Sequence, residues 1–155
     1  MKKVVLLRID DRLLHGQVVV SWIHFLKVNE VIITDDEYAR DEFMCQLIEA
    51  SAPENIAVQV LTVYDTVSYL MGEDEGSRIL ILCKNIETVK NLVEKVEIDT
   101  INLGGLGAAQ GRKRFHNSIH LSDEEINILK DIARKNVNVE VKMLPKDKAV
   151  VINGN

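Results

Sequence analysis

Short runs of consecutive apolar residues alternate along the chain with segments whose apolar residues recur at helical spacing. Runs such as VVLL, VII and ILIL are apolar at every position, which is typical of strands covered on both faces. The pattern predicts five buried strands, at residues 3–9, 30–35, 57–63, 78–83 and 100–103.

Five helices are predicted between and after these strands, the first over residues 16–27. Asp65 or Thr66 is expected to cap the third helix, and Ser122 with Glu125 is expected to form a capping box at the start of the fifth. The second helix is expected to bury one apolar face, made of Phe43, Met44, Leu47 and Ile48.

This alternation predicts a parallel α/β sheet with right-handed crossovers. Residues 136–144, NVNVEVKML, alternate polar and apolar positions and are interpreted as an edge strand with one wet face. The tail after Pro145 has room for one more short strand. We expect one domain over residues 1–155, a three-layer α/β sandwich with a mostly parallel central sheet, helices on both faces and one or two C-terminal edge strands.

Composition and charge narrow the class of protein. The formal net charge of −5 argues against a general nucleic-acid binder. No apolar run approaches the roughly 20 residues of a membrane span, and the apolar stretch in MKKVVLLRID ends at Arg8, short of the roughly 7–15 residues of a signal peptide. Cys45 and Cys83 lie among apolar residues without a CxxC motif, as expected of buried thiols in a cytoplasmic protein.

The polar stretch RIDDRLLHG follows the first strand directly. In open α/β sheets, ligands bind beyond the carboxyl ends of the strands, where helix N-termini offer free amides to anions. His15 lies at this corner, immediately before Gly16 and the first helix. The position favours a site for a phosphoryl group.

The residue types in this stretch suit phosphoryl transfer. The neutral imidazole of His15 would carry one lone-pair nitrogen that can attack phosphorus. Arg12 could hold phosphoryl oxygens in a bidentate manner, and Arg8 could do so if the sheet edge brings it close. The amides of Gly16 and Gln17 are candidate oxyanion donors. From chemistry and position alone, the alternative is that His15 caps a turn in a solvated loop.

Three acidic residues could support such a site. Asp10 or Asp11 could orient the imidazole of His15 through its other N–H, or lock Arg12 in place. Asp35, at the end of the second strand, could reach Arg12 or His15, or it could instead cap the helix at EYARD.

The string RIDDRLLHGQVVVSW resembles the signature of the enzyme IIB component of the mannose/fructose/sorbose family of the bacterial sugar phosphotransferase system. The match runs without a break from Arg8 to Val18, and Trp22 follows at the expected place. VIITDDEYARDEF and INLGG also resemble the family. The resemblance implies a mostly parallel α/β fold and a protein-N(π)-phosphohistidine–sugar phosphotransferase.

The resemblance further implies that His15 is phosphorylated on Nδ1. It would accept the phosphoryl group from the IIA component and pass it to a sugar held by the membrane components IIC and IID, with which the chain would associate peripherally. The sugar stays open among mannose, fructose, sorbose, glucosamine and N-acetylgalactosamine, and a homodimer is compatible with the family. No cofactor or metal is expected, since a phosphohistidine donor needs no GxxxxGK[ST] loop for ATP.

A second unusual stretch is GGLGAAQGRKRFHN, residues 104–117. Its glycines could form a phosphate nest beside the first loop or a flexible turn. Arg112, Lys113 and Arg114 form a compact cationic patch, which is interpreted as either a solvated loop or a docking surface for IIA.

The other histidines are expected to be structural. His24 lies near Trp22 and Phe25 in the first helix and is expected to pack there. His116 and His120 lie in HNSIH, which is interpreted as a loop followed by a strand, so no metal pair is predicted.

Two other function classes fit parts of the sequence. Asp10 and Asp11 follow the first strand and Asp65 follows the third, as in a phosphoaspartate receiver domain. A receiver would place a lysine after the fifth strand, where this chain has Gly104 and Gly105. A nucleotide-binding module would need a phosphate loop that the sequence lacks.

Overall fold

The computed structural model of the chain describes residues 1–155. Its strands are β1 (Val4–Asp10), β2 (Glu30–Thr34), β3 (Ala57–Leu61), β4 (Ile79–Cys83), β5 (Thr100–Gly105), β6 (Lys113–His116), β7 (Ile119–Leu121), β8 (Asn138–Val141) and β9 (Val150–Ile152). Its helices are α1 (Gly16–Leu26), α2 (Asp36–Ala39), α3 (Glu42–Ala50), α4 (Val63–Leu70), α5 (Ile86–Val93) and α6 (Asp123–Ala133).

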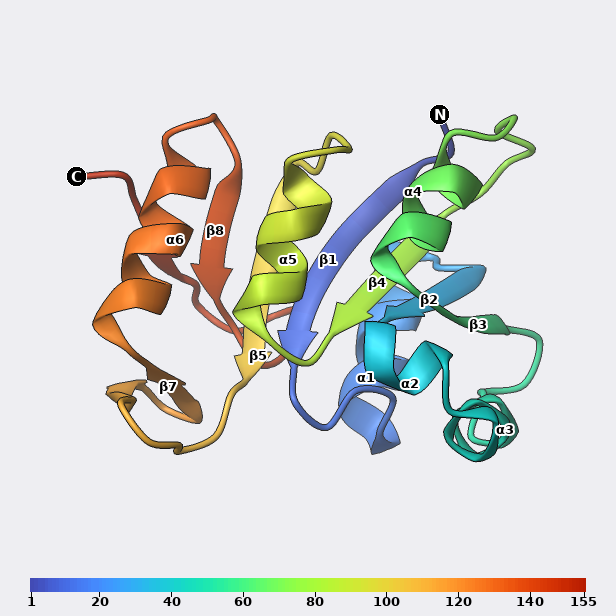
Figure 1. Ribbon diagram of the computed structural model, residues 1–155, viewed down its shortest axis with the longest axis horizontal. Helices are drawn as coiled ribbons and strands as arrows, with labels where there is room; N and C mark the ends of the chain where they lie inside the picture. Colours follow the sequence, from blue (N-terminus) through green and yellow to red (C-terminus); the bar gives the residue numbers. More distant parts are fainter.

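Seven strands form one sheet in the order β3-β2-β4-β1-β5-β8-β9, and β6 pairs with β7 in a separate hairpin. All neighbouring strands of the large sheet are parallel except β8 and β9. β1 lies between β4 and β5, so the loop after it emerges at the middle of the carboxyl edge, toward the bottom of Figure 1. This edge is where α/β sheets bind ligands.

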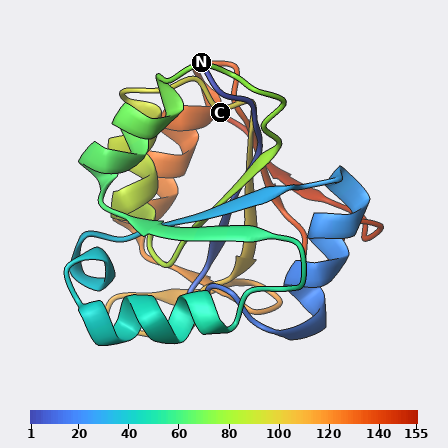
Figure 2. The ribbon, with the colours of Figure 1, turned by 90° about the vertical axis from the view of Figure 1, so that its right-hand side faces the viewer.

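Helices cover both faces of the sheet, which makes three layers (Figure 2). α1 and α3 pack on one face, and α4, α5 and α6 pack on the other. In β4, Ile79, Ile81 and Cys83 belong to one apolar core, whereas Leu80 and Leu82 belong to the opposite one. Both faces of this strand are therefore buried, which explains its continuous apolar sequence and confirms the predicted architecture.

The five predicted strands are present, but one interpretation at the C-terminus is wrong. β9 pairs with β8 in the antiparallel direction and takes the edge of the sheet, so β8 is not the edge strand. Val139 and Val141 are buried, whereas Glu140 between them is half-buried. The alternation in β8 therefore belongs to the strand next to the edge strand β9. The hairpin of β6 and β7 within residues 104–121 was also not predicted, because β6 has no buried residue.

Helix capping follows the predictions in one case and differs in another. The capping box of Ser122 and Glu125 at the start of α6 is confirmed. Thr62, rather than Asp65 or Thr66, caps α4, because the helix begins at the next residue. The Thr62 hydroxyl accepts a hydrogen bond from the amide of Asp65 at 3.0 Å.

Two expectations about packing are wrong. α3 buries only Ile48 of its predicted apolar face and leaves Phe43 71% and Leu47 53% exposed. His24 is exposed on α1. Trp22 faces the sheet and is buried, and His24, two positions further along the helix, therefore lies on a different face.

Two expectations drawn from composition concern the burial of the cysteines and membrane-spanning helices. Cys83 is fully buried, and burial raises the pKa of its thiol, whereas Cys45 is only half-buried. Both thiols are free. Among the helices, none combines the length and the apolar character that crossing a bilayer requires.

Candidate functional site

The loop of residues 11–15 connects β1 to α1 and carries the candidate phosphoryl acceptor. Leu13 anchors it, since its side chain is only 5% exposed and packs in the apolar core although its φ of 55° is left-handed. Gly16, the first residue of α1, has a φ of 43°, a conformation that favours glycine. These two bends place His15 at the N-cap position of α1.

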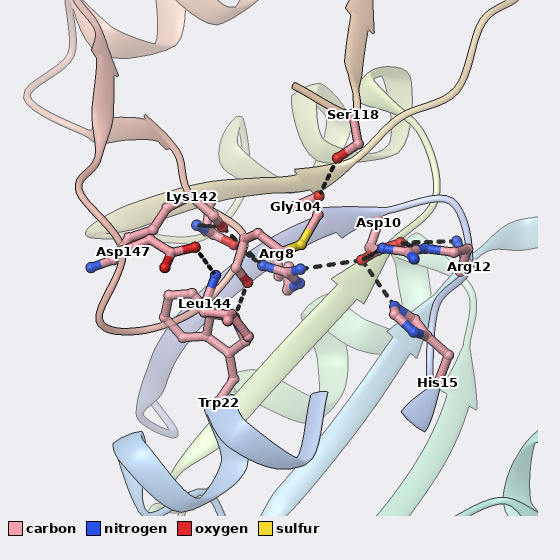
Figure 3. A network of polar contacts seen from close by, with 12 residues as sticks. Arg8, Asp10, Arg12, His15, Trp22, Gly104, Ser118, Lys142, Leu144 and Asp147 are labelled. Carbon is pink, nitrogen blue, oxygen red and sulfur yellow. Dashed lines mark hydrogen bonds and ion pairs between the residues drawn. The ribbon is translucent and has the colours of Figure 1, made fainter. Parts of the chain in front are cut away.

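Asp10 ends β1 without any exposed surface and contacts three polar side chains (Figure 3). Its Oδ1 accepts hydrogen bonds from the backbone N and the Nε of Arg12, both at 3.1 Å. Its Oδ2 accepts one from Arg8 Nη2 at 3.2 Å and lies 3.1 Å from His15 Nε2. One carboxylate therefore holds both arginines and the histidine.

The ionisation of Asp10 sets the tautomer of His15. Burial opposes the charged form, but the hydrogen bonds from Arg12 and His15 outweigh burial and lower the pKa of Asp10. An ionised carboxylate only accepts hydrogen bonds, so Nε2 of His15 carries the proton. In the neutral imidazole, Nδ1 then holds the lone pair; it has no hydrogen-bond partner in the protein, and the His15 side chain is 23% exposed.

α1 is the one helix whose N-terminus lacks a capping side chain. His15 is its N-cap residue, but the imidazole makes no hydrogen bond to the helix. The first amides of α1, those of Gly16 and Gln17, are therefore free to bind an anion beside His15. Each of the other five helices is capped by a side chain, from Asp35, Asp41, Thr62, Asn85 and Ser122.

The two arginines next to the site are placed differently. The Arg12 side chain is 50% exposed while paired with Asp10, so its guanidinium is accessible to a phosphoryl group. Arg8 has no exposed surface, and its Nη1 donates to the backbone oxygen of Lys142 at 3.2 Å. The expectation that Arg8 binds phosphate is therefore wrong, because its guanidinium lies on the buried side of Asp10.

Neither Asp11 nor Asp35 is bonded to the imidazole of His15. Asp11 Oδ2 accepts a hydrogen bond from the amide of Gly107 at 2.7 Å, which ties the loop after β1 to the loop after β5. Asp35 is buried and accepts one from the amide of Tyr38 at 2.9 Å. Of the two roles considered for Asp35, the structure shows the capping role.

The cations of the glycine-rich segment do not form one patch. Arg112 donates to both carboxylate oxygens of Glu125 at 3.0 Å and to the backbone oxygen of Gly107 at 3.1 Å. Lys113 and Arg114 are exposed on β6. The triple patch expected from the sequence is therefore reduced to two exposed cations, because Glu125 neutralises the third.

One residue near the site, Asn102, was not singled out by sequence reasoning, whereas Gly104 and Gly105 were considered there as part of a phosphate nest or a flexible turn. Asn102, fully buried in β5, accepts a hydrogen bond from Arg8 Nη1. Gly104 and Gly105 follow it, and a Cβ on Gly105 would come within 3.0 Å of Asp10 Oδ1. In the sequence, the polar Asn102 and the two glycines stand out from the apolar residues of the strand TINLGG, and this pattern could have indicated a role at the site.

Together, these groups can bind and transfer a phosphoryl group. The site offers a nitrogen lone pair, free helix amides, an accessible guanidinium and a carboxylate that balances positive charge on the imidazole. No group of three or more His, Cys, Asp or Glu side chains is placed to hold a metal ion. His116 and His120 lie on β6 and β7 of the hairpin.

Comparisons with known proteins agree with this chemistry. The family model described as PTS system sorbose subfamily IIB component matches residues 4–153. The PTS system fructose-specific EIIB component of Bacillus subtilis is 30% identical over 149 residues, which cover 95% of this chain and 91% of that protein. The PTS system mannose-specific EIIAB component of Escherichia coli K12 is 31% identical over 144 residues, which cover 92% of this chain and 45% of that protein.

A solved structure shows the same fold. The crystal structure of manxB from Thermoanaerobacter tengcongensis matches with a TM-score of 0.90 and 34% identity, covering 98% of this chain and 93% of that one. The family match spans nearly the whole chain and includes the loop that carries His15. The chain therefore belongs to the sorbose-subfamily IIB components of the sugar phosphotransferase system, and its role is in sugar phosphotransfer.

Proposed function

We propose that His15 is the residue that carries the phosphoryl group. It accepts this group on Nδ1 from a phosphohistidine of a IIA component and passes it to a sugar held by the membrane components IIC and IID. The observation that supports this best is the 3.1 Å contact between His15 Nε2 and the ionised Asp10 carboxylate, which leaves Nδ1 as the ring nitrogen with a lone pair.

In the first transfer, the Nδ1 lone pair forms a bond to phosphorus while the N–P bond of the donor breaks and the donor imidazole leaves with the bonding pair. The ring of His15 keeps its proton on Nε2 and gains positive charge, which Asp10 stabilises from 3.1 Å. In the second transfer, a sugar hydroxyl attacks phosphorus and loses its proton to water, and Nδ1 leaves with the bonding pair, which returns the ring of His15 to its neutral form with the proton on Nε2.

The free amides of Gly16 and Gln17 and the guanidinium of Arg12 are the groups that would bind the phosphoryl oxygens. Phosphoryl transfer depends mainly on alignment and charge stabilisation, which these groups supply. Because no side chain caps α1, a phosphoryl group on His15 would complete the helix N-terminus without displacing a competitor.

The names of the relatives indicate a phosphoryl donor but do not identify the sugar. The mannose relative is named an EIIAB component, which supports a IIA component as the phosphoryl donor. The fructose and mannose relatives are 30% and 31% identical to this chain, so similarity to them does not select a sugar.

The test is to incubate the protein with radiolabelled phospho-IIA and to locate the label. We expect an acid-labile, base-stable phosphate on His15. His15→Ala must take up none, whereas His24→Ala, which removes an exposed histidine of the same helix, must label like the wild type. Label that persists in His15→Ala would contradict the proposal, and label on Asp65 would favour the receiver-like alternative.

A further inference from the structure

A buried arginine lies behind the site (Figure 3). Arg8 is fully buried, and its Nη2 lies 3.2 Å from Asp10 Oδ2. Its Nη1 donates to Asn102 Oδ1 and to the backbone oxygen of Lys142, and its guanidinium lies 5.5 Å from the ring of Trp22. Residues from β1, β5, α1 and the end of β8 thus enclose one cation.

Stability alone is a weak explanation for this cation. Burial lowers the pKa of Arg8, although the neighbouring Asp10 carboxylate opposes that effect. The Nε atom is buried without any hydrogen-bond partner. A buried ion pair of this kind gains little net stability, because the desolvation of both charges offsets their attraction.

The fold leaves space specifically for this side chain. A Cβ on Gly104 would lie 2.0 Å from Cζ of Arg8, which is far too close for any real contact. The φ of Gly104 is not in the left-handed region, so the backbone does not require glycine there. Position 104 therefore requires glycine because the guanidinium of Arg8 occupies the space that a Cβ would fill.

We propose that Arg8 is a positioning residue for phosphoryl transfer, an inference that rests on the proposed role of His15. Arg8 fixes the Asp10 carboxylate with Oδ2 toward His15 and balances its charge, so that Nε2 keeps the proton and Nδ1 stays free. Arg8 touches neither His15 nor the phosphoryl group and acts only through the carboxylate.

The second arginine cannot replace this function. Arg12 binds the same carboxylate, but its side chain is 50% exposed and is the group available to the incoming phosphoryl oxygens. Once Arg12 turns toward a phosphoryl group, Arg8 is the cation that still balances Asp10. The buried arginine therefore keeps the carboxylate fixed while the exposed one exchanges partners.

The experiment uses the unphosphorylated, isotope-labelled full chain. NMR follows the titration of the Asp10 carboxyl carbon and the hydrogen-bonded Nε2–H signal of His15 in wild type, Arg8→Met and Gly104→Ala. Gly104→Ala is expected to push the guanidinium off Asp10 while the charge of the chain stays the same. Arg134→Met, which removes an exposed arginine at the end of α6, is the matched control.

In both test variants we expect Asp10 to titrate at higher pH and the Nε2–H signal to disappear. Uptake of the phosphoryl group should slow by about tenfold to a hundredfold, because a small misplacement of a reacting group can cause losses of this size. Arg8→Lys, which retains a cation, should restore part of each property. Arg134→Met should match the wild type in all three.

Variants that fold and keep both NMR properties of the wild type would overturn the proposal, even with slow uptake, because Arg8 would then be only a structural brace. If Arg8→Met does not fold, Gly104→Ala and Arg8→Lys decide by the same readouts. A wild type that showed the expected NMR properties but took up no phosphate would contradict the proposed function of His15 and not the positioning role of Arg8.

Discussion

The carboxylate of Asp11 accepts a hydrogen bond from the backbone amide of Gly107 at 2.7 Å. The carbonyl of the same glycine accepts one from Arg112, which is bound to Glu125 at the start of α6. The loop that carries His15 is therefore connected to the glycine-rich segment and, through it, to a helix on the opposite face of the sheet.

This connection predicts that Asp11→Ala loosens the loop and slows phosphoryl uptake by about tenfold or more, because small misplacements of reacting groups cause losses of this size. Rapid-quench measurement of uptake from phospho-IIA would test it. The control is Asp74→Ala, whose carboxylate also accepts two backbone hydrogen bonds, from Gly76 and Ser77, but in another loop. Equal uptake in the two variants would show that the Asp11 contact has no role in transfer.

Arg12→Ala should leave folding intact and slow transfer by about tenfold or more, because a charge clamp can contribute roughly a thousandfold or more to phosphoryl transfer. Arg12→Lys should recover only part of the rate, since lysine keeps the charge but lacks the planar fork. Single-turnover uptake measures both, with Arg40→Ala, an exposed arginine after α2, as the control. Wild-type rates in Arg12→Ala would exclude this side chain from phosphoryl binding.

The fold could be predicted from the sequence mainly because the central strands are buried on both faces. Runs such as ILILC can be assigned without tertiary information, since an apolar residue at every position of so short a run is typical of a strand covered on both faces. β6 and β7 are different, because they form a hairpin outside the large sheet and Lys113 and Arg114 are exposed. Their formation depends on the loop that precedes them, which local patterning does not describe.

The candidate site could likewise be predicted from the sequence only in part. The position of His15 before an uncapped helix follows from the order of strand, loop and helix along the chain. The roles of Arg8 and Asp35 depend on side-chain direction at one sheet edge, and the sequence does not give that direction. Arg8 points inward because Asn102 and Gly104 of β5 provide a partner and space for it. These residues are distant in the sequence and meet only in the folded sheet.

The uncapped N-terminus of α1 predicts that phosphorylation stabilises the protein. A phosphoryl group on His15 would bind the free amides, as a capping side chain does, and such caps contribute about 1 kcal/mol. Urea denaturation at alkaline pH, where phosphohistidine persists, should show a higher free energy of unfolding for the phosphorylated form. An equal or lower value would mean that the phosphoryl group does not reach the helix amides.

Glu125 predicts a specific dependence of stability on pH. Burial opposes its ionisation, but the hydrogen bonds from Arg112 and from the amide of Ser122 outweigh burial and lower the pKa of Glu125. A carboxyl whose pKa is lower in the folded state stabilises the fold at neutral pH and loses this contribution as the pH falls through the folded pKa. Glu125→Gln should therefore lower the free energy of unfolding at pH 7, and the difference should shrink below about pH 4.

Urea denaturation at several pH values would measure this dependence, with Glu124→Gln as the exposed control on the same helix turn. Parallel pH curves for the wild type and Glu125→Gln would show that the ion pair with Arg112 does not contribute to stability.

Lys113 and Arg114 are the cations through which the hairpin could attract a IIA component. The protein as a whole carries a net charge of −5, so two exposed cations on one hairpin provide a local positive field. Such charges act mainly on the association rate and are screened by salt. Lys113→Ala with Arg114→Ala should slow uptake from phospho-IIA severalfold at low salt, and the difference should fade at about 0.5 M salt. Stopped-flow measurement of association at several salt concentrations tests this.

The control is Lys95→Ala with Lys135→Ala, which removes two exposed lysines after the C-terminal ends of α5 and α6 and so has the same net charge as the test variant. If both double variants slow association equally, net charge rather than the hairpin attracts the donor; if neither does, the contact with IIA does not depend on these cations.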